Sequence, residues 1–342
     1  MESKSKILLI YTGGTIGMIK DYRSGALMPF DFSELESKIP ELSQLECTIK
    51  SISFEHPIDS SNMKPQDWLK IAGLIEQNYD LFDGFVVLHG SDTMSYTSSA
   101  LSYMLENLSK PVVFTGSQLP IGDLRTDAKE NLITSIQIAA LKEKNKPLIQ
   151  EVCLYFEYKL YRANRTTKVN AEHFKAFESP NFPPLITSGV HLKINYSSLL
   201  KPKGNKKLVV HKALDNNVAI LKLFPGFSEK LLEGVLRVPD LKAIILETYG
   251  AGNAPTEEWL FRELKKAIEK GIHIVNVTQC YGGSVLMGSY KTSEVLKKLP
   301  LINGGDITTE AAITKLMYLL GSRVSKKSFQ TIFETSLRGE MT

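Results

Sequence analysis

Apolar runs of strand length alternate with longer amphipathic segments through the first half of the chain. The apolar runs occupy residues 6–11, 84–90, 111–116 and 151–156. Between them, the segments 95–108 and 127–141 repeat apolar residues every three or four positions, as a helix with one buried face does. Strands and helices in this alternation build a mostly parallel sheet with helices on both faces. The sequence therefore predicts an α/β fold.

A second, shorter series of the same kind follows a polar, turn-prone segment at 196–212. Its predicted strands are 218–224, 242–250 and 273–280, and its predicted helices are 228–237, 256–270 and 308–320. At roughly 100–200 residues per domain, a chain of 342 residues accommodates two domains. We expect a larger N-terminal domain (1–195) with a parallel-rich sheet flanked by helices, a linker (196–212), and a smaller C-terminal α/β domain (213–342) with a parallel sheet.

Two local signals predict helix ends. Asp127 followed by Glu130 resembles a capping box and predicts that a helix begins there. Gly321 stands where a C-terminal cap is expected for the helix over 308–320.

Composition and charge disfavour several classes of protein. The formal net charge is +4, and the basic residues form no stripe interleaved with aromatics, so we expect no nucleic-acid partner. Cys47, Cys153 and Cys280 are far apart and odd in number, which fits a reducing compartment. No segment approaches the roughly 18 apolar residues of a membrane span, and the first apolar run is too short for a signal peptide. We expect a cytoplasmic protein without a membrane partner.

Three predicted strands end in glycines beside hydroxyl residues, at 12–15, 89–93 and 115–118. In open α/β sheets, ligands bind outside the carboxyl ends of the strands. Glycine permits a tight turn and lets a ligand approach backbone N–H groups, and a hydroxyl beside them can act as a nucleophile. These ends are the candidate site.

Other site chemistries lack their motifs. The chain has neither the G-x-G-x-x-G spacing of a dinucleotide site nor a P-loop, and it lacks the G-x-S-x-G of a Ser-His-Asp hydrolase. We expect His89 to be a hydrogen-bonded residue at a strand end rather than a catalytic base. No metal is expected, because the histidines show no paired ligand spacing. They are His56, His89, His173, His191, His211 and His273.

A Thr or Ser nucleophile without histidine needs another base, such as a buried lysine, a tyrosine or a lysine–carboxylate relay. Asp92 lies at a strand end, and Lys168 lies in the basic stretch 161–170, although a lysine there is more often a solvated loop residue. From the residues alone, the chain is an α/β hydrolase or transferase with a Thr or Ser nucleophile.

The motifs at these positions resemble the L-asparaginase family, and within it the cytoplasmic type I bacterial enzymes. They follow the family's order at 11–18, 59–63, 83–120, 161–168, 249–255, 276–280 and 337–342. The resemblance implies hydrolysis of L-asparagine to L-aspartate and ammonia without a cofactor. It also implies tight homodimers, commonly paired into homotetramers, with active sites at the tight interface.

The resemblance implies a role for each matched residue. Thr15 would be the nucleophile that forms a β-aspartyl ester. Ser91, Asp92 and Lys168 would relay a proton to the leaving ammonia and activate water. Asp59, Ser60, Asp92, Ser117 and the Ser91 backbone N–H would bind substrate, and Asn253 matches a residue that reaches a partner's site.

The chain departs from the family pattern at two catalytic positions. Ser91 replaces the usual threonine, which keeps the hydroxyl but loses the methyl that restricts χ1, so we expect activity to be retained. The tyrosine that usually follows the loop glycine is replaced by Ala26. Tyr22 and Tyr290 are the candidates for its role, and we favour Tyr290.

A third departure concerns regulation. Thr167 and Cys280 match positions of a second asparagine site in some type I enzymes, but Glu247 stands where an arginine would hold the effector's carboxylate. Because two carboxylates repel, we do not expect this regulation in that form.

Three other functions remain open. The asparaginase-like subunit of a tRNA-dependent amidotransferase shares these motifs but carries an additional N-terminal domain, whereas the nucleophile motif here begins at residue 12. A glutaminase activity differs by one methylene in the pocket, worth about 1–3 kcal/mol. The third is a catalytically silent amino-acid sensor.

Overall fold

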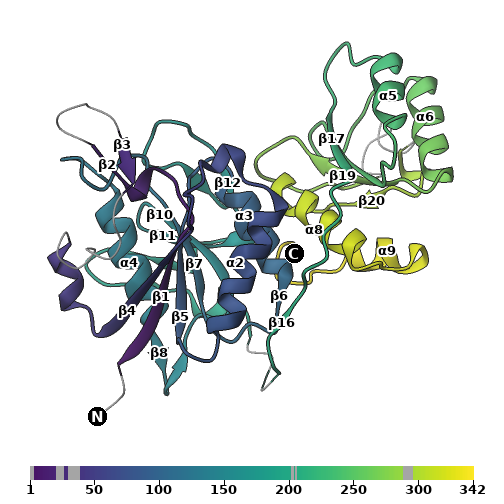
Figure 1. Cartoon of the computed structure of the whole chain (residues 1–342). Helices are drawn as coiled ribbons and strands as arrows, with labels where there is room; N and C mark the ends of the chain where they lie inside the picture. The colour runs from purple at the N-terminus through teal and green to yellow at the C-terminus, as the bar shows by residue number, and fades with distance from the viewer. Residues whose placement is uncertain (1–3, 21–26, 30–38, 202–203, 205, 288–295) are drawn as a thin grey trace. The chain divides into compact units, whose positions relative to one another are not determined.

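The computed structural model of the chain describes residues 4–20, 27–29, 39–201, 204, 206–287 and 296–342 (Figure 1). They form two units, Met1–His211 and Lys212–Thr342, each with its own sheet and buried core. The segment 196–212, which we expected to be a linker, contains β16 (Val209–Val210). This strand pairs with β6 (Leu105–Glu106) of the first unit. Among the described helices, none has the length and apolar content to cross a membrane.

The first unit contains an eight-stranded sheet in the order β15-β14-β11-β10-β7-β5-β1-β4. Five neighbouring strands, from β10 to β4, pair in parallel, and β11, β14 and β15 add an antiparallel edge. The parallel-rich sheet that the sequence predicts is therefore confirmed. The strands are β1 (Ser5–Tyr11), β4 (Cys47–Ser53), β5 (Gly84–Leu88), β7 (Val112–Thr115), β10 (Val152–Phe156), β11 (Lys159–Arg162), β14 (Ile186–Thr187) and β15 (Lys193–Ile194).

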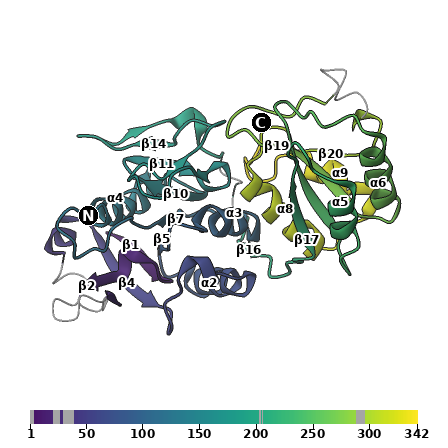
Figure 2. The same ribbon diagram turned by 90° about the horizontal axis from the view of Figure 1, so that it is seen from above.

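Helices cover both faces of this sheet. Seen from above in Figure 2, α4 (Ala128–Ala140) lies on one side, and α2 (Pro65–Asn78) and α3 (Met94–Met104) lie on the other. Side chains alternate between the two faces of a strand, so every second residue of β1 faces the same way. Ile7 and Leu9 accordingly share one buried cluster with Leu132 and Ile136 of α4.

The Asp127 signal predicts the start of the helix correctly but not the partner of its carboxylate, whereas the Gly321 signal is wrong. Asp127 is the N-cap of α4, but its carboxylate makes no cap hydrogen bond and instead accepts from the backbone N–H groups of Gln118 and Leu119. Gly321 lies inside α8 (Thr309–Gly321), which ends at Ser322 with φ −73°. A Cβ at Gly321 would lie 2.3 Å from the carbonyl oxygen of Ala213, so glycine is needed there for close packing.

Three short antiparallel pairs complete the strands of the first unit. Of these, β12 and β13 matter most for function because β12 carries Lys168, which pairs with Phe177 in the ladder. The pairs are β2 (Met18–Lys20) with β3 (Leu27–Pro29), β8 (Lys142–Glu143) with β9 (Lys146–Pro147), and β12 (Thr167–Lys168) with β13 (Phe177–Glu178).

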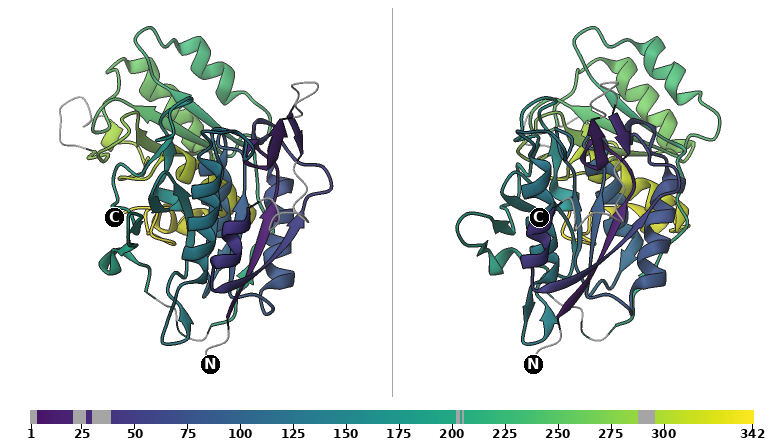
Figure 3. Two further views of the ribbon diagram at one scale, coloured as in Figure 1. Left: turned by 90° about the vertical axis from the view of Figure 1, so that its left-hand side faces the viewer. Right: turned by 60° about the vertical axis from the view of Figure 1, so that its left-hand side comes forward.

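The second unit contains a four-stranded, wholly parallel sheet in the order β17-β18-β19-β20. Within this unit, α5 and α6 lie on one face of the sheet and α8 on the other (Figure 1; Figure 3). The smaller parallel α/β domain that we expected is therefore confirmed. Its elements are β17 (Val218–Lys222), β18 (Ala243–Thr248), β19 (His273–Thr278), β20 (Ile302–Asn303), α5 (Glu229–Leu236), α6 (Glu258–Glu269), α8 and α9 (Lys326–Phe333).

Candidate active site

The carboxyl ends of three adjacent strands meet in the first unit. β7, β5 and β1 are neighbours, and their register places Tyr11 beside Leu88 and Leu88 beside Thr115. The ladder continues past the strands, because the backbone N–H and the hydroxyl of Thr12 both donate to the Leu88 carbonyl, at 3.0 and 2.9 Å. His89 N–H donates to the Thr115 carbonyl at 2.9 Å. The three glycine- and hydroxyl-bearing ends are thus brought together.

Glycines let these ends approach one another through their main chains. A Cβ at Gly13 would lie 2.1 Å from the Ile58 carbonyl oxygen, and one at Gly14 would lie 2.4 Å from the Gly90 nitrogen. Both glycines also have positive φ, 135° and 86°, which other residues rarely adopt. A Cβ at Gly90 would lie 2.6 Å from Ser60 Oγ. The ends of β1 and β5 and the loop after β4 therefore form one backbone floor.

Thr15 follows Gly14 on this floor and begins a short 3₁₀ turn over Thr15–Gly17. The turn rests on Tyr11, whose hydroxyl donates to the Gly17 carbonyl at 3.1 Å. Burial raises the pKa of Tyr11 to about 12, so the phenol remains a neutral donor. Thr15 is half-buried, and its hydroxyl has no hydrogen-bond partner within the described ranges. Tyr22 and Tyr290, the candidates for activating it, lie outside the described residues.

Lys168 joins the second group of candidate residues. Its ammonium donates to Ser91 Oγ at 2.8 Å and to Asp92 Oδ1 at 2.6 Å. The Lys168 side chain is 18% exposed, whereas that of Asp92 is 62% exposed. Lys168 is therefore not a solvated loop residue: β12 holds it inward, against the residues that follow β5.

Asp59 and Ser60 lie beside the backbone floor, in the loop after β4. The Asp59 carboxylate is exposed and accepts from the backbone N–H and the hydroxyl of Ser61, at 3.0 and 2.9 Å. These hydrogen bonds lower the pKa of Asp59, and the one from the Ser61 backbone N–H has the larger effect. Ser60 is buried, and its carbonyl accepts from the Thr93 hydroxyl at 2.7 Å.

The other predicted residues have separate surroundings. Ser117 is buried and donates to the Leu119 carbonyl at 2.6 Å.

The remaining predicted residues lie in different units. Thr167 lies on β12 of the first unit, whereas Asn253, Glu247 and Cys280 lie in the second unit. Asn253 exchanges two 2.8 Å backbone hydrogen bonds with Tyr249, the Glu247 carboxylate accepts from the Thr309 hydroxyl at 2.7 Å, and the Cys280 N–H donates to Thr278 Oγ1 at 3.1 Å.

His89 is a hydrogen-bonded residue at a strand end, as expected. It is fully buried, and its Nδ1 lies 2.7 Å from the Gly90 carbonyl oxygen. Nε2 has no hydrogen-bond partner among the described residues. Burial lowers the pKa of His89 to about 4, so the ring is neutral near pH 7 and Nδ1 donates to Gly90.

Sequence reasoning did not identify the residues that brace the turn after β7. The Asp127 carboxylate accepts from the Gln118 N–H at 3.0 Å and from the Leu119 N–H at 3.1 Å. Asn131 Nδ2 donates to the Gly116 carbonyl at 3.0 Å. The capping pattern drew attention to Asp127, but it suggested a different partner for its carboxylate.

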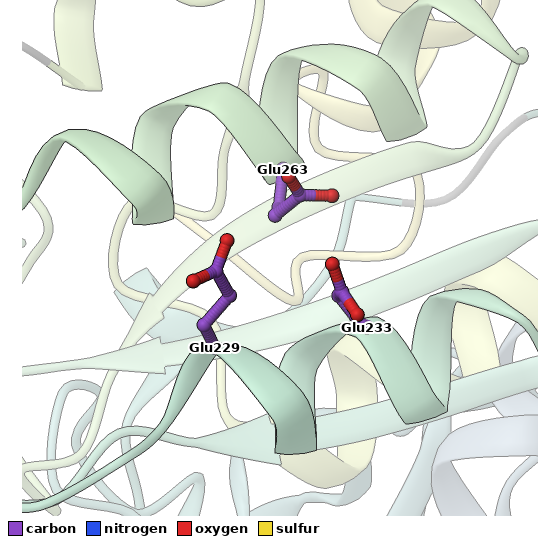
Figure 4. Close-up of side chains that lie close together, drawn as sticks. All are labelled: Glu229, Glu233 and Glu263. Atoms are coloured by element: carbon purple, nitrogen blue, oxygen red, sulfur yellow. The ribbon is translucent and has the colours of Figure 1, made fainter.

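Among the described residues, one acidic cluster in the second unit has the side chains to be considered as a metal site. Glu229 and Glu233 of α5 face Glu263 of α6, with one carboxylate oxygen of each within 4.8 Å of the others (Figure 4). Each of these carboxylates already forms an ion pair with a basic side chain. Arg262 pairs with Glu229 and Glu263, Lys266 lies 2.7 Å from Glu263, and Arg237 lies 3.0 Å from Glu233. The cluster is a surface ion-pair network between two helices.

Comparisons with known proteins agree over the whole chain. The family model described as "Asparaginase, N-terminal" matches residues 6–200, and "Glutaminase/Asparaginase C-terminal domain" matches residues 217–333. L-asparaginase 1 of Escherichia coli (strain K12) is 43% identical over 100% of this chain and 99% of that protein. The 60 kDa lysophospholipase of Mus musculus is 39% identical over 100% of this chain and 63% of that protein. The crystal structure of L-asparaginase I from Vibrio cholerae O1 biovar eltor has a TM-score of 0.91 at 41% identity and covers 99% of both chains.

The fold, the strand-end site and these comparisons define a hydrolase of α/β architecture. The family models together match well over half of the chain. The chain belongs to the asparaginase family, as its motifs predicted.

Proposed function

We propose that the protein is an L-asparaginase that hydrolyses L-asparagine to L-aspartate and ammonia. The observation that carries the proposal is the contact of Lys168 with Ser91 and Asp92. These residues lie beside the backbone floor, on which Thr15 follows Gly14. The near full-length similarity to L-asparaginase 1 of Escherichia coli supports the same activity. An amidotransferase subunit and a silent sensor are less well supported.

In the first step, Thr15 Oγ attacks the carbon of the substrate's side-chain amide. The new carbon–oxygen bond forms an ester, the carbon–nitrogen bond breaks, and the proton lost by Thr15 is balanced by protonation of the leaving ammonia. The Ser91 N–H stabilises the oxyanion that develops on the carbonyl oxygen. Tyr290, or alternatively Tyr22, takes the proton from Thr15 in its tyrosinate form and returns it to the Thr15 oxygen when the ester is hydrolysed.

In the second step, water hydrolyses the ester and restores the Thr15 hydroxyl. Lys168 donates to Ser91, so the proton that the leaving nitrogen received in the first step came from the ammonium through the Ser91 hydroxyl and left Lys168 as a neutral amine. The neutral amine then removes a proton from the attacking water by the same route. Asp92 holds the Lys168 side chain in place through its 2.6 Å contact.

The substrate is held by charges of opposite sign and by hydrogen bonds. The carboxylates of Asp59 and Asp92 bind the α-ammonium group, Ser60 binds the α-carboxylate, and Ser117 lines the pocket. Asn253 reaches the active site of a partner subunit in a homodimer, and two dimers pair into a homotetramer. The location is cytoplasmic, as for the type I enzymes that the sequence resembles.

Replacement of Thr15 tests the proposal directly. We expect the purified protein to release one ammonia per aspartate from L-asparagine and Thr15→Ala to lower kcat by at least about 10³-fold. Thr15→Ser, which keeps a hydroxyl, should retain part of the activity. Mass spectrometry after reaction with a slow substrate analogue should find the adduct on Thr15. Full ammonia release by Thr15→Ala, or an adduct on another residue, would disprove the mechanism.

A further inference from the structure

We propose that Gln118 is a positioning residue that sets the direction of the Ser91 hydroxyl. The inference rests on the proposed function, because it assigns Ser91 a place in the proton relay. Gln118 connects three parts of the site: the turn after β7, the residues after β5, and the loop between β12 and β13.

The hydrogen bonds of the Gln118 amide fix which way its oxygen faces. Its Nε2 donates to the Ala171 carbonyl at 3.1 Å and to the His173 carbonyl at 3.0 Å. Carbonyl oxygens only accept, so both must be met by the NH₂ end of the amide. The oxygen Oε1 therefore points the other way, where it lies 3.4 Å from Ser91 Oγ.

The two neighbours of the Ser91 hydroxyl then leave it one orientation. The Lys168 ammonium can only donate and lies 2.8 Å away, so Ser91 accepts from it. The Gln118 oxygen can only accept, so the Ser91 proton points toward Gln118. At 3.4 Å this is a long hydrogen bond, which directs the hydroxyl but lets it turn toward a substrate.

Serine needs this guidance because it lacks a second group on Cβ. A threonine at the same place would have restricted χ1 through its methyl, whereas a serine rotates more freely. The backbone of Gln118 is itself fixed, since the Asp127 carboxylate accepts its N–H at 3.0 Å. Gln118 thus orients the Ser91 hydroxyl through a hydrogen bond, in place of the methyl group that serine lacks.

A double-mutant cycle between positions 118 and 91 tests the proposal. Gln118→Met keeps the length of the side chain and removes both its oxygen and its NH₂ group. We expect it to lower kcat by about 10-fold with little change in KM. In a Ser91→Thr background, the same change should cost no more than about 3-fold, because the methyl now orients the hydroxyl. Equal losses in both backgrounds would overturn the proposal.

A matched control separates positioning from general damage. Gln150 donates to the Pro147 carbonyl at 3.1 Å, away from the site, so Gln150→Met should leave kcat unchanged. If Gln118→Met does not fold, Gln118→Leu serves in the same cycle, because it also removes both the oxygen that accepts from Ser91 and the NH₂ group that donates to Ala171 and His173. Absence of ammonia release by the unmodified protein would instead disprove the proposed function.

Discussion

Single residues around the site owe their charge to their surroundings. Two hydrogen bonds from Ser61 lower the pKa of Asp59, and burial raises the pKa of Tyr11, so both shifts reinforce the charge state that these groups ordinarily have near pH 7. His89 is neutral for the same reason as Tyr11, although it ends a strand that leads directly into Ser91. Asp59, Tyr11 and His89 all lie at or beside the strand ends that form the candidate site.

The neutral His89 makes stability depend on pH. The unfolded chain binds a proton on this ring below pH 6.5, whereas the folded chain does so only below about pH 4. Because the unfolded state binds more protons between these values, the free energy of unfolding should fall as the pH falls from 6.5 to 4, by roughly 3 kcal/mol.

His89→Asn tests this dependence with a side chain that does not titrate in this range. The Asn Nδ2 occupies the place of Nδ1 and can still donate to the Gly90 carbonyl. Urea denaturation at pH 7.0, 5.5 and 4.5 should give a stability difference from the natural protein that shrinks as the pH falls. A difference that stays constant over this range would show that His89 is not the group responsible.

At the scale of elements, sequence reasoning succeeded where a signal is local. Buried strands such as β1 and β5 are continuous apolar runs, and α4 and α6 carry regular apolar faces, so all were predicted to within a few residues. The strand β4 was missed because it is a largely exposed edge strand with polar residues at alternate positions.

The same distinction explains which parts of the site were predictable. Glycine beside a hydroxyl is visible in the sequence, so the strand ends of Thr15 and Ser91 were identified as the candidate site. The contact of Gln118 with the 171–173 loop joins residues more than 50 positions apart, and nothing local encodes it. Asp127 has the sequence context of a helix cap, but its carboxylate is used by the preceding turn.

Changes at Asp127 should therefore act through the turn after β7. Asp127→Ala leaves the N–H groups of Gln118 and Leu119 without this acceptor, which should cost about 1–3 kcal/mol of stability and also lower kcat. Asp127→Asn keeps one accepting oxygen and should cost less on both measures. Thermal unfolding and ammonia release measure the two effects.

Ser228→Ala is the matched control for a lost cap. Ser228 caps α5 by accepting from the Leu231 N–H at 3.3 Å, so its loss should lower stability without changing kcat. The role assigned to Asp127 would be wrong if Asp127→Ala behaved in the same way.

At the scale of the whole molecule, each unit contains a buried ion pair apart from the candidate site. In the first unit, Arg162 lies 2.6 Å from Glu151. In the second, the ammonium of Lys315 in α8 contacts Glu340 and donates to the carbonyls of Phe333 and Thr335 at 2.7 and 2.8 Å. Lys315 and Glu340 are fully buried, so this pair fastens the end of the chain to α8.

Breaking the Lys315–Glu340 pair from one side should destabilise the second unit strongly. Lys315→Met leaves the Glu340 carboxylate buried without its cation, and we expect a loss of about 3–5 kcal/mol in the free energy of unfolding. Adding Glu340→Gln removes the unpaired charge and should restore part of the stability. Chemical denaturation of the single and double variants measures both, and a double variant no more stable than Lys315→Met would refute the explanation.

The contacts that the glycines permit also limit how this protein can evolve. Most binding sites are reshaped by exchanging the side chains that line them, but beneath Thr15 the lining is peptide bond against peptide bond. A side chain in place of Gly13 or Gly14 can only add atoms where none fit, so this part of the candidate site should not tolerate gradual change. A new substrate preference would then have to arise in the loops around these glycines.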